Sequence, residues 1–162
     1  MSNKSTDTLI YNTAVKNGIV SAVINGITTW FELNSMEKIP FTLDNISNRE
    51  VTVFGSVFPV VISLSIILGI INYFTFKKTA KKENLADAET LNKPFFPGML
   101  KLILARTFSA VGLLMILAVL WQKYIGVIYT GNIMASALVG ISAGLTSVYI
   151  AVSVSKEIVR EK

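Results

Sequence analysis

The chain has 162 residues, of which 52% are hydrophobic and only 15% are charged, and its formal net charge is +5. Soluble domains carry about 25% charged residues, so this composition lacks the charged surface that water requires and indicates a protein dissolved in lipid. It also excludes a disordered chain and a nucleic-acid-binding domain. Cysteine and histidine are both absent, which excludes disulfides, thiolate nucleophiles, histidine catalysis and the common zinc and haem sites. We expect no cofactor, no metal site and no catalytic residue.

The first expected helix covers residues 14–33 and is the least apolar of four. Its uncharged run extends only from Asn17 to Phe31 and contains amide, hydroxyl and glycine residues. A cleaved signal peptide is the alternative interpretation, because Lys16 precedes the run. It fits less well, since the run is polar for a signal peptide and Trp30 and Phe31 do not form a small-residue cleavage site. We therefore expect a membrane-spanning helix.

Polar side chains on this helix share one face, because they recur at spacings of four, four and three residues. Near the bilayer centre, an amide without a hydrogen-bond partner costs several kcal/mol. Two interpretations remain: these groups form hydrogen bonds to other helices, or they line a path for a solute. The residues are Asn17, Ser21, Asn25 and Thr28.

Small residues recur at every fourth position on the first helix and again on the last one. Such stripes allow two helix backbones to approach closely. We predict that the first and last helices pack against each other or against copies of themselves. The residues are Gly18, Ala22 and Gly26 on the first helix, and Ser136, Gly140 and Gly144 on the last.

Residues 34–51 form the expected outer loop, which we interpret as an exposed irregular connector rather than as a cover over the mouth of the bundle. Within it, Ser47 and Glu50 have the spacing of a helix-capping box. The second helix, residues 52–76, lies in a run of 26 residues without a charge. That run is long enough to cross a hydrocarbon core about 30 Å thick.

Two residues interrupt the apolar pattern of the second helix. Pro59 predicts a kink if the helix continues through it, either as a passive feature of the bundle or as a hinge. Asn72, close to the inner end, is interpreted as an interfacial residue.

Residues 77–98 form the expected inner loop, which begins with four lysines. Such clusters attract anionic lipid headgroups by about 1 kcal/mol per residue. They also anchor the orientation of a membrane protein, so either role accounts for them. The residues are Lys77, Lys78, Lys81 and Lys82.

Besides Lys101 at its start, the third helix, residues 99–122, includes one charge, Arg106. This side chain either reaches back to the headgroups or faces inward, where it would favour an anionic solute or a lipid phosphate. The fourth helix, residues 133–154, follows a turn signal at Thr130-Gly131-Asn132. The four expected helices contain one carboxylate, Glu32 at the outer end of the first, and none deeper in a span, which removes proton coupling, carboxylate catalysis and metal-assisted hydrolysis from the expected functions.

The orientation follows from the distribution of Lys and Arg. Eleven lie in the two ends and the middle loop when Lys16 and Lys101, at the adjoining helix ends, are counted with them, and three lie in the other two loops. The positive-inside rule places the eleven in the cytoplasm. Both termini are then cytoplasmic, which requires an even number of spans.

The sequence therefore predicts an all-α fold: an integral membrane four-helix bundle with cytoplasmic N and C termini, forming a single membrane domain over residues 1–162. We expect a non-catalytic protein that acts through helix contacts as an accessory or assembly partner. The alternative is a small permease or channel component that works as an oligomer, with a polar path along the first helix. Expected partners are the bilayer, anionic headgroups, and either further copies or another membrane protein, but no nucleic acid. Twelve Lys, three Arg and eleven Asn are typical of an AT-rich bacterial genome, which favours a bacterial cytoplasmic membrane.

Overall fold

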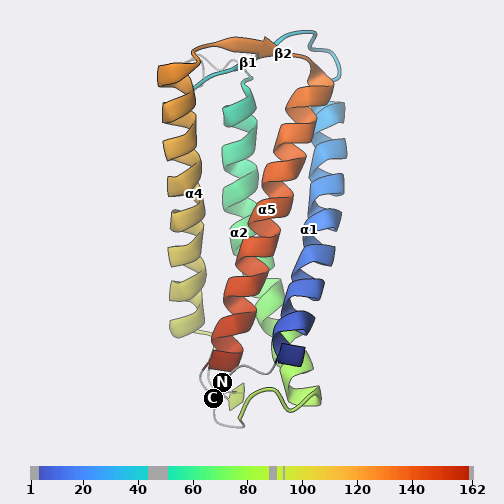
Figure 1. Cartoon of the computed structure of the whole chain (residues 1–162), viewed down its shortest axis with the longest axis vertical. Helices are drawn as coiled ribbons and strands as arrows, with labels where there is room; N and C mark the ends of the chain where they lie inside the picture. The colour runs from blue at the N-terminus through green and yellow to red at the C-terminus, as the bar shows by residue number, and fades with distance from the viewer. Residues whose placement is uncertain (1–3, 44–50, 88–90, 93, 161–162) are drawn as a thin grey trace.

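The computed structural model describes residues 4–43, 51–87, 91–92 and 94–160. Four long helices run side by side along the molecule (Figure 1). The two ends of the described chain, at Lys4 and Arg160, lie at the same end of the bundle, which we call the terminus end. Two short strands cross the opposite end, called the strand end (Figure 1). The elements are α1 (Lys4–Glu32), β1 (Ile39–Phe41), α2 (Val53–Lys82), α4 (Gly98–Tyr124), β2 (Ile128–Thr130) and α5 (Asn132–Arg160).

The prediction of an all-α chain with four helices is confirmed. Three of the helices, α2, α4 and α5, are long and apolar enough to cross a membrane. With 29 residues, α1 is as long as α5, about 43 Å at 1.5 Å per residue. Its amide, hydroxyl and glycine residues keep it outside the set of helices apolar enough to span.

Three helices extend well beyond the limits expected from the charge pattern, and one of them is α5, which runs to Arg160 rather than to residue 154. α1 begins at Lys4 rather than at residue 14, because Ile10 and Ala14 are buried in the bundle. α2 runs to Lys82 rather than to residue 76, so the four lysines lie on a helix and not in a loop. The expected limits were set by charged residues, which indicate where a span leaves the hydrocarbon. Helical backbone hydrogen bonding continues past such a residue until a capping residue ends the helix.

A residue in the left-handed backbone conformation ends α2. Asn84 has a φ of 52°, and the amide of Leu85 donates to the carbonyl of Ala80 at 2.9 Å, which is the Schellman arrangement. Ala80 is fully buried and Leu85 packs against the same cluster. This cap therefore fixes the end of α2 against the core at the terminus end.

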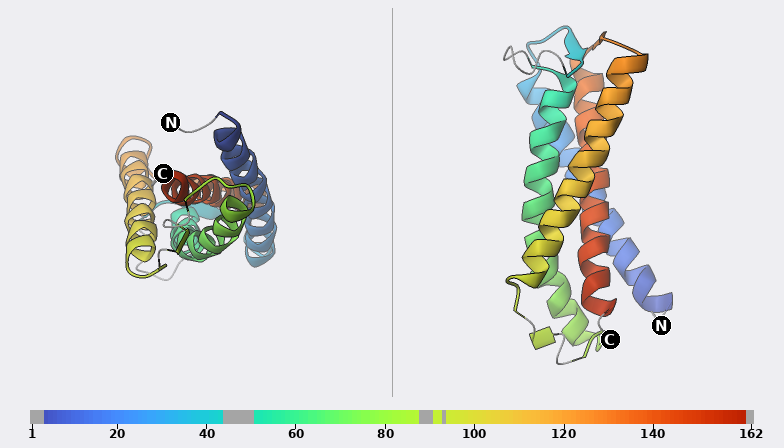
Figure 2. Two further views of the ribbon diagram at one scale, coloured as in Figure 1. Left: turned by 90° about the horizontal axis from the view of Figure 1, so that it is seen from below. Right: turned by 90° about the vertical axis from the view of Figure 1, so that its left-hand side faces the viewer.

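Two apolar clusters form the core, one toward each end of the bundle. α5 contributes to both, and it lies with α2 between α4 on one flank and α1 on the other (Figure 2). α4 is the least buried of the apolar helices. The terminus-end cluster contains Ile10, Tyr73, Phe76, Ala80, Ile103, Ile150, Val154 and Ile158. The strand-end cluster contains Leu33, Ile39, Val53, Val57, Val61, Ala135 and Val139.

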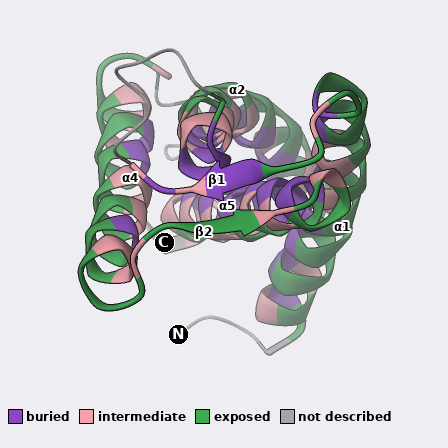
Figure 3. Ribbon diagram, turned by 90° about the horizontal axis from the view of Figure 1, so that it is seen from above, coloured by how far each residue is buried: buried purple, intermediate pink, exposed green. Residues whose placement is uncertain are grey.

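The described part of the outer loop is not an exposed irregular connector, so that interpretation is wrong. β1 pairs antiparallel with β2, with Ile39 opposite Thr130 and Phe41 opposite Ile128. Ile39 and Thr42 have no exposed surface, and β1 lies as a buried strand across the end of the bundle with β2 exposed beside it (Figure 3). The pairing joins two loops that are far apart in sequence, which a pattern confined to one loop does not predict.

A threonine caps the start of α2. The hydroxyl of Thr52 accepts a hydrogen bond from the amide of Gly55 at 2.9 Å, as an N-cap residue does. Ser47 and Glu50, which have capping-box spacing, lie outside the described residues. Before α4, Pro97 occupies the N-cap position, one residue before the helix begins.

Candidate functional site

The small-residue faces of α1 and α5 lie against each other within one chain. A Cβ placed on Gly144 would lie 3.0 Å from the carbonyl oxygen of Gly18 and 3.0 Å from the Cβ of Ala22. One placed on Gly18 would overlap the side chain of Val148. Glycine is therefore required at these positions because the two backbones are in contact.

The contact is looser toward the strand end. A Cβ on Gly26 would lie 3.6 Å from the carbonyl oxygen of Ser136, an ordinary van der Waals distance. Ser136 is itself buried, and its hydroxyl donates to the carbonyl of Asn132 at 2.7 Å. The six small residues named from the sequence thus form one internal interface of this chain.

The four polar residues of α1 do not converge on one site. Ser21 is buried, Asn17 and Asn25 are half-buried, and Thr28 is exposed. The amide of Asn25 donates to the carbonyl of Ser21 in its own helix at 2.8 Å. Spacing alone placed these residues on one face, but the neighbouring helices cover only part of that face.

One of these residues joins two helices. The amide nitrogen of Asn17 donates to the Oδ1 atom of Asn72 on α2 at 3.3 Å. Asn72 is buried, with 8% of its surface exposed, so its side chain faces a neighbouring helix. An amide among apolar helices requires such a partner.

Four buried polar side-chain atoms in the described part of the chain have no hydrogen-bond partner. They are the Nε1 atom of Trp121 on α4, the Nδ2 atom of Asn72, and the hydroxyl oxygens of Ser65 and Ser147. Both serines have no exposed surface. Unpaired buried hydroxyls are costly, and neither serine was distinguished by the sequence because serine is common in apolar helices as a small residue.

The remaining candidates lie on the surface. Arg106 is exposed on α4, and Pro59 is exposed on α2. α2 continues through Pro59, whose carbonyl oxygen accepts a hydrogen bond from the hydroxyl of Ser63 at 2.7 Å. Lys78, Lys81 and Lys82 are exposed on the last turns of α2, where positive charge interacts favourably with the helix C-terminus.

Lys77 differs from the other lysines of this cluster because it is half-buried. Its ammonium group donates to the hydroxyl of Tyr73 at 3.0 Å. The ring of Tyr73 lies 5.2 Å from that of Phe95, which joins the end of α2 to the segment before α4. Lys77 therefore has a structural contact in addition to any contact with lipid.

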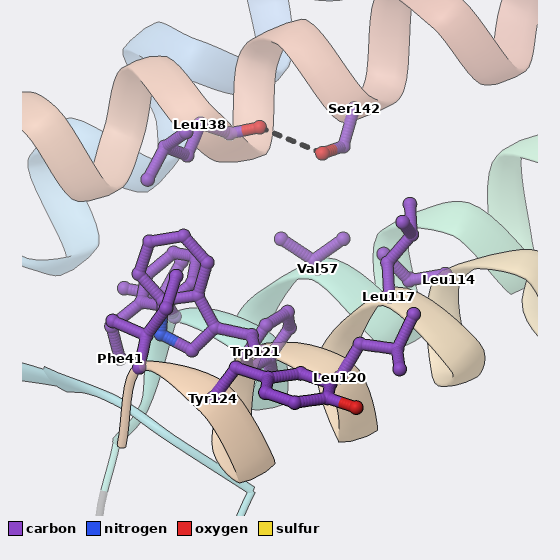
Figure 4. A pocket seen from close by; sticks show the side chains of 12 residues that line it. Phe41, Val57, Leu114, Leu117, Leu120, Trp121, Tyr124, Leu138 and Ser142 are labelled. Atoms are coloured by element: carbon purple, nitrogen blue, oxygen red, sulfur yellow. Dashed lines mark hydrogen bonds between the residues drawn. The ribbon is translucent and has the colours of Figure 1, made fainter. Parts of the chain in front are cut away.

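An apolar pocket of about 500 Å³ lies between α2, α4 and α5 at the strand end, and we call it the strand-end pocket (Figure 4). None of the polar candidates from the sequence lines it. Its floor is formed by α2 and its walls by α4 and α5. The lining residues are Phe41, Val53, Phe54, Val57, Leu114, Leu117, Leu120, Trp121, Tyr124, Ile125, Leu138 and Ser142.

Aromatic rings cluster at the strand end of the pocket. The ring of Phe41 lies 4.6 Å from that of Phe54 and 4.4 Å from that of Trp121. Gln122 holds this end of α4 to the loop, since its Oε1 atom accepts from the hydroxyl of Thr42 at 2.8 Å and from the amide of Leu43 at 3.4 Å. The sequence signals only an interfacial aromatic at Trp121, because the contacts depend on where β1 crosses the bundle.

No group of three or more Asp or Glu residues that could hold a metal ion occurs within the described ranges. The strand-end pocket presents hydrocarbon, aromatic and hydroxyl groups and no carboxylate. The lining of the strand-end pocket is therefore suited to contact with apolar molecules.

Comparison of the chain with protein-family models, with curated proteins and with solved structures finds no match.

Proposed function

We propose that the chain is a multi-pass membrane protein in which all four helices cross the bilayer. The three long apolar helices support this proposal. α1 is included because it packs backbone to backbone along α5, so a bilayer that surrounds α5 also surrounds α1. The outer side of α1 supports its inclusion, since its large apolar side chains there are exposed. They are Val15, Ile19, Val20, Val23, Ile24 and Ile27.

We further propose that the terminus end is cytoplasmic. Exposed lysines gather there, at the end of α2, the start of α4 and the end of α5, and positive residues favour the cytoplasmic side. Residue usage favours a bacterial cytoplasmic membrane. The lysines would contact anionic headgroups at that surface.

Cysteine labelling tests this orientation with little background because the chain has no cysteine of its own. Ser5→Cys places a thiol at the terminus end and Glu37→Cys places one at the strand end, both on exposed residues. In intact cells, a membrane-impermeant maleimide should label position 37 alone, and both positions after lysis. Labelling of position 5 in intact cells would overturn the orientation, and recovery of the protein in water without detergent would overturn insertion.

For the role of the protein, we propose a non-catalytic accessory or assembly partner that binds another membrane helix. The observation that carries this proposal is the uncovered face of α4. Its buried residues are Ile103, Thr107 and Ala118, whereas Ala105, Ser109 and Gly112 are exposed. These are small residues at spacings of four and three, which suit close contact with a helix, and α1 already uses its own small residues inside the chain.

Site-specific photo-crosslinking tests this role. A photoreactive residue at Gly112, where a side chain would meet nothing within 4 Å, should give a discrete adduct in native membranes. The matched control is the same residue at Ile24, an exposed position on α1, which should give none. Twice the mass of the chain would identify a second copy, and another mass a different partner. Gly112→Leu should also abolish co-purification of a stoichiometric partner, and the absence of an adduct from position 112 would contradict this role.

A permease or channel component is the second candidate, and the polar groups buried between the helices favour it. The Asn17–Asn72 pair and the unpaired hydroxyls of Ser65 and Ser147 lie within the bundle. Four helices enclose little volume, so transport would require an oligomer. Reconstituted liposomes that exchange a solute, with loss of exchange in Asn17→Leu and in Asn25→Leu, would favour this candidate over the accessory role.

A further inference from the structure

The strand-end pocket offers its occupant almost no hydrogen bond. The hydroxyl of Ser142 already donates to the carbonyl of Leu138 at 2.8 Å (Figure 4). The Nε1 atom of Trp121 is enclosed by protein. The other side chains that face the interior of the pocket are apolar. The part of a ligand that enters is therefore hydrocarbon, because a polar group would lose its hydrogen bonds there.

A positive charge lies beside the pocket, next to one of its lining residues. Tyr124 lines the pocket and is 74% exposed. The ammonium nitrogen of the next residue, Lys123, lies 5.5 Å from the centre of the Tyr124 ring, within the range of a cation–π contact. Lys123 is exposed, so it remains available to an anion at the surface.

Together these groups match a molecule with a hydrocarbon chain and an anionic head. In a bilayer, the end of an apolar helix that carries Trp and Tyr lies at headgroup depth. The pocket then extends from that depth toward the acyl chains of the same leaflet. We propose that the strand-end pocket binds one acyl chain of an anionic phospholipid of the surrounding leaflet, with its headgroup at Lys123. This inference rests on the proposed insertion in a membrane.

The two tryptophans of the chain allow a direct test. Trp30→Phe leaves Trp121, which lines the pocket, as the single tryptophan, which is excited selectively at wavelengths that tyrosine does not absorb. The variant is reconstituted in vesicles of zwitterionic phospholipid that contain a small fraction of phospholipid with brominated chains, since bromine quenches tryptophan on contact. The brominated lipid is anionic in one series and zwitterionic in the other. We expect the anionic brominated lipid to reach half-maximal quenching at a fraction of total lipid about fivefold lower than the zwitterionic brominated lipid does. This factor corresponds to the attraction of about 1 kcal/mol between one lysine and an anionic headgroup.

Two pairs of variants locate the bound lipid. Ser142→Phe fills the pocket from α5 and should remove the quenching at low lipid fraction, whereas Ile141→Phe, at the exposed neighbouring position, should retain it. Leu117→Phe fills the pocket from α4 and serves if Ser142→Phe does not fold. Lys123→Gln should make the two lipids equal, whereas Lys101→Gln, exposed at the other end of α4, should preserve the preference.

Several results would overturn the inference. Equal quenching by both lipids, unchanged by Ser142→Phe and Leu117→Phe, would show that the pocket holds no lipid. Loss of the preference in Lys101→Gln as well would assign it to surface charge in general. The pocket would instead bind a second copy of the chain if two results were obtained together. Neither brominated lipid would quench Trp121, and Ser142→Phe would abolish a dimer that the protein forms in detergent.

A second reporter separates this inference from the proposed function. Trp121→Phe leaves Trp30, which is exposed near the strand end of α1. Both brominated lipids should quench Trp30 alike if the bundle is inserted in the bilayer. Unquenched Trp30 would contradict insertion, whereas quenched Trp30 with a Trp121 indifferent to lipid charge would contradict only the lipid site.

Discussion

Gly140 on α5 lies directly against the backbone of Ala22 on α1: a Cβ on Gly140 would lie 2.7 Å from the carbonyl oxygen of Ala22. That oxygen belongs to a helix backbone and cannot rotate away as a side chain does. The two helices must therefore separate to accept even one additional carbon atom at this position.

Gly140→Ala should accordingly destabilise the protein by about 1–3 kcal/mol, the usual cost of overpacking. Gly26→Ala should be neutral or stabilising by up to about 1 kcal/mol, because its Cβ fits and alanine favours a helix. Thermal unfolding in detergent measures both, and Gly112→Ala is the control with open space around it. Equal stability of the Gly140 and Gly26 variants would contradict the close contact of α1 with α5.

Asn17→Leu should destabilise the bundle by about 1–2 kcal/mol, because it leaves the buried Oδ1 atom of Asn72 without its partner. Replacing both residues by leucine should recover part of the loss, since no unpaired amide then remains. Asn25→Leu should have little effect on stability, because the amide of Asn25 bonds only to its own helix. A double-mutant cycle of unfolding in detergent provides the measurement, and a coupling energy near zero would exclude the hydrogen bond.

Ser147→Ala should leave the melting temperature unchanged or raise it. The hydroxyl of Ser147 is fully buried without a partner, and such a group costs about 1–3 kcal/mol. Ser136→Ala is the matched control, since that buried hydroxyl does make a hydrogen bond. A clear drop in melting temperature for Ser147→Ala, larger than that for Ser136→Ala, would reveal a partner for the Ser147 hydroxyl.

Gln122→Leu should release the outer loop from α4, because the side-chain oxygen of Gln122 accepts from both Thr42 and Leu43. We expect a loss of about 1–2 kcal/mol and faster proteolysis within residues 34–51. Protease added to the strand-end side of reconstituted vesicles, followed by mass spectrometry, detects the cleavage. Lys123→Leu changes the neighbouring residue without removing these bonds, and equal cleavage in both variants would argue against the tether.

Patterns local to one segment were sufficient to predict the helices. The long uncharged runs predicted α2 and α5, and a shorter run after Arg106 predicted α4, because apolar side chains and helical backbone hydrogen bonding are both properties of a continuous stretch. The glycine spacing likewise indicated which sides of α1 and α5 could approach a neighbour. The ends of the helices were less predictable, since Lys4 and Lys82 lie beyond the apolar runs and are included through capping and packing.

The relations between distant segments could not be predicted from such patterns. Nothing in the vicinity of Asn17 indicates that Asn72 will face it, and nothing near Ile39 indicates that Thr130 will pair with it. The same holds for the strand-end pocket, which exists because α4 diverges from α5 where Phe41 and Trp121 meet. Composition and periodicity determine which surfaces are apolar or small, whereas the choice among partners depends on how all the helices pack at once.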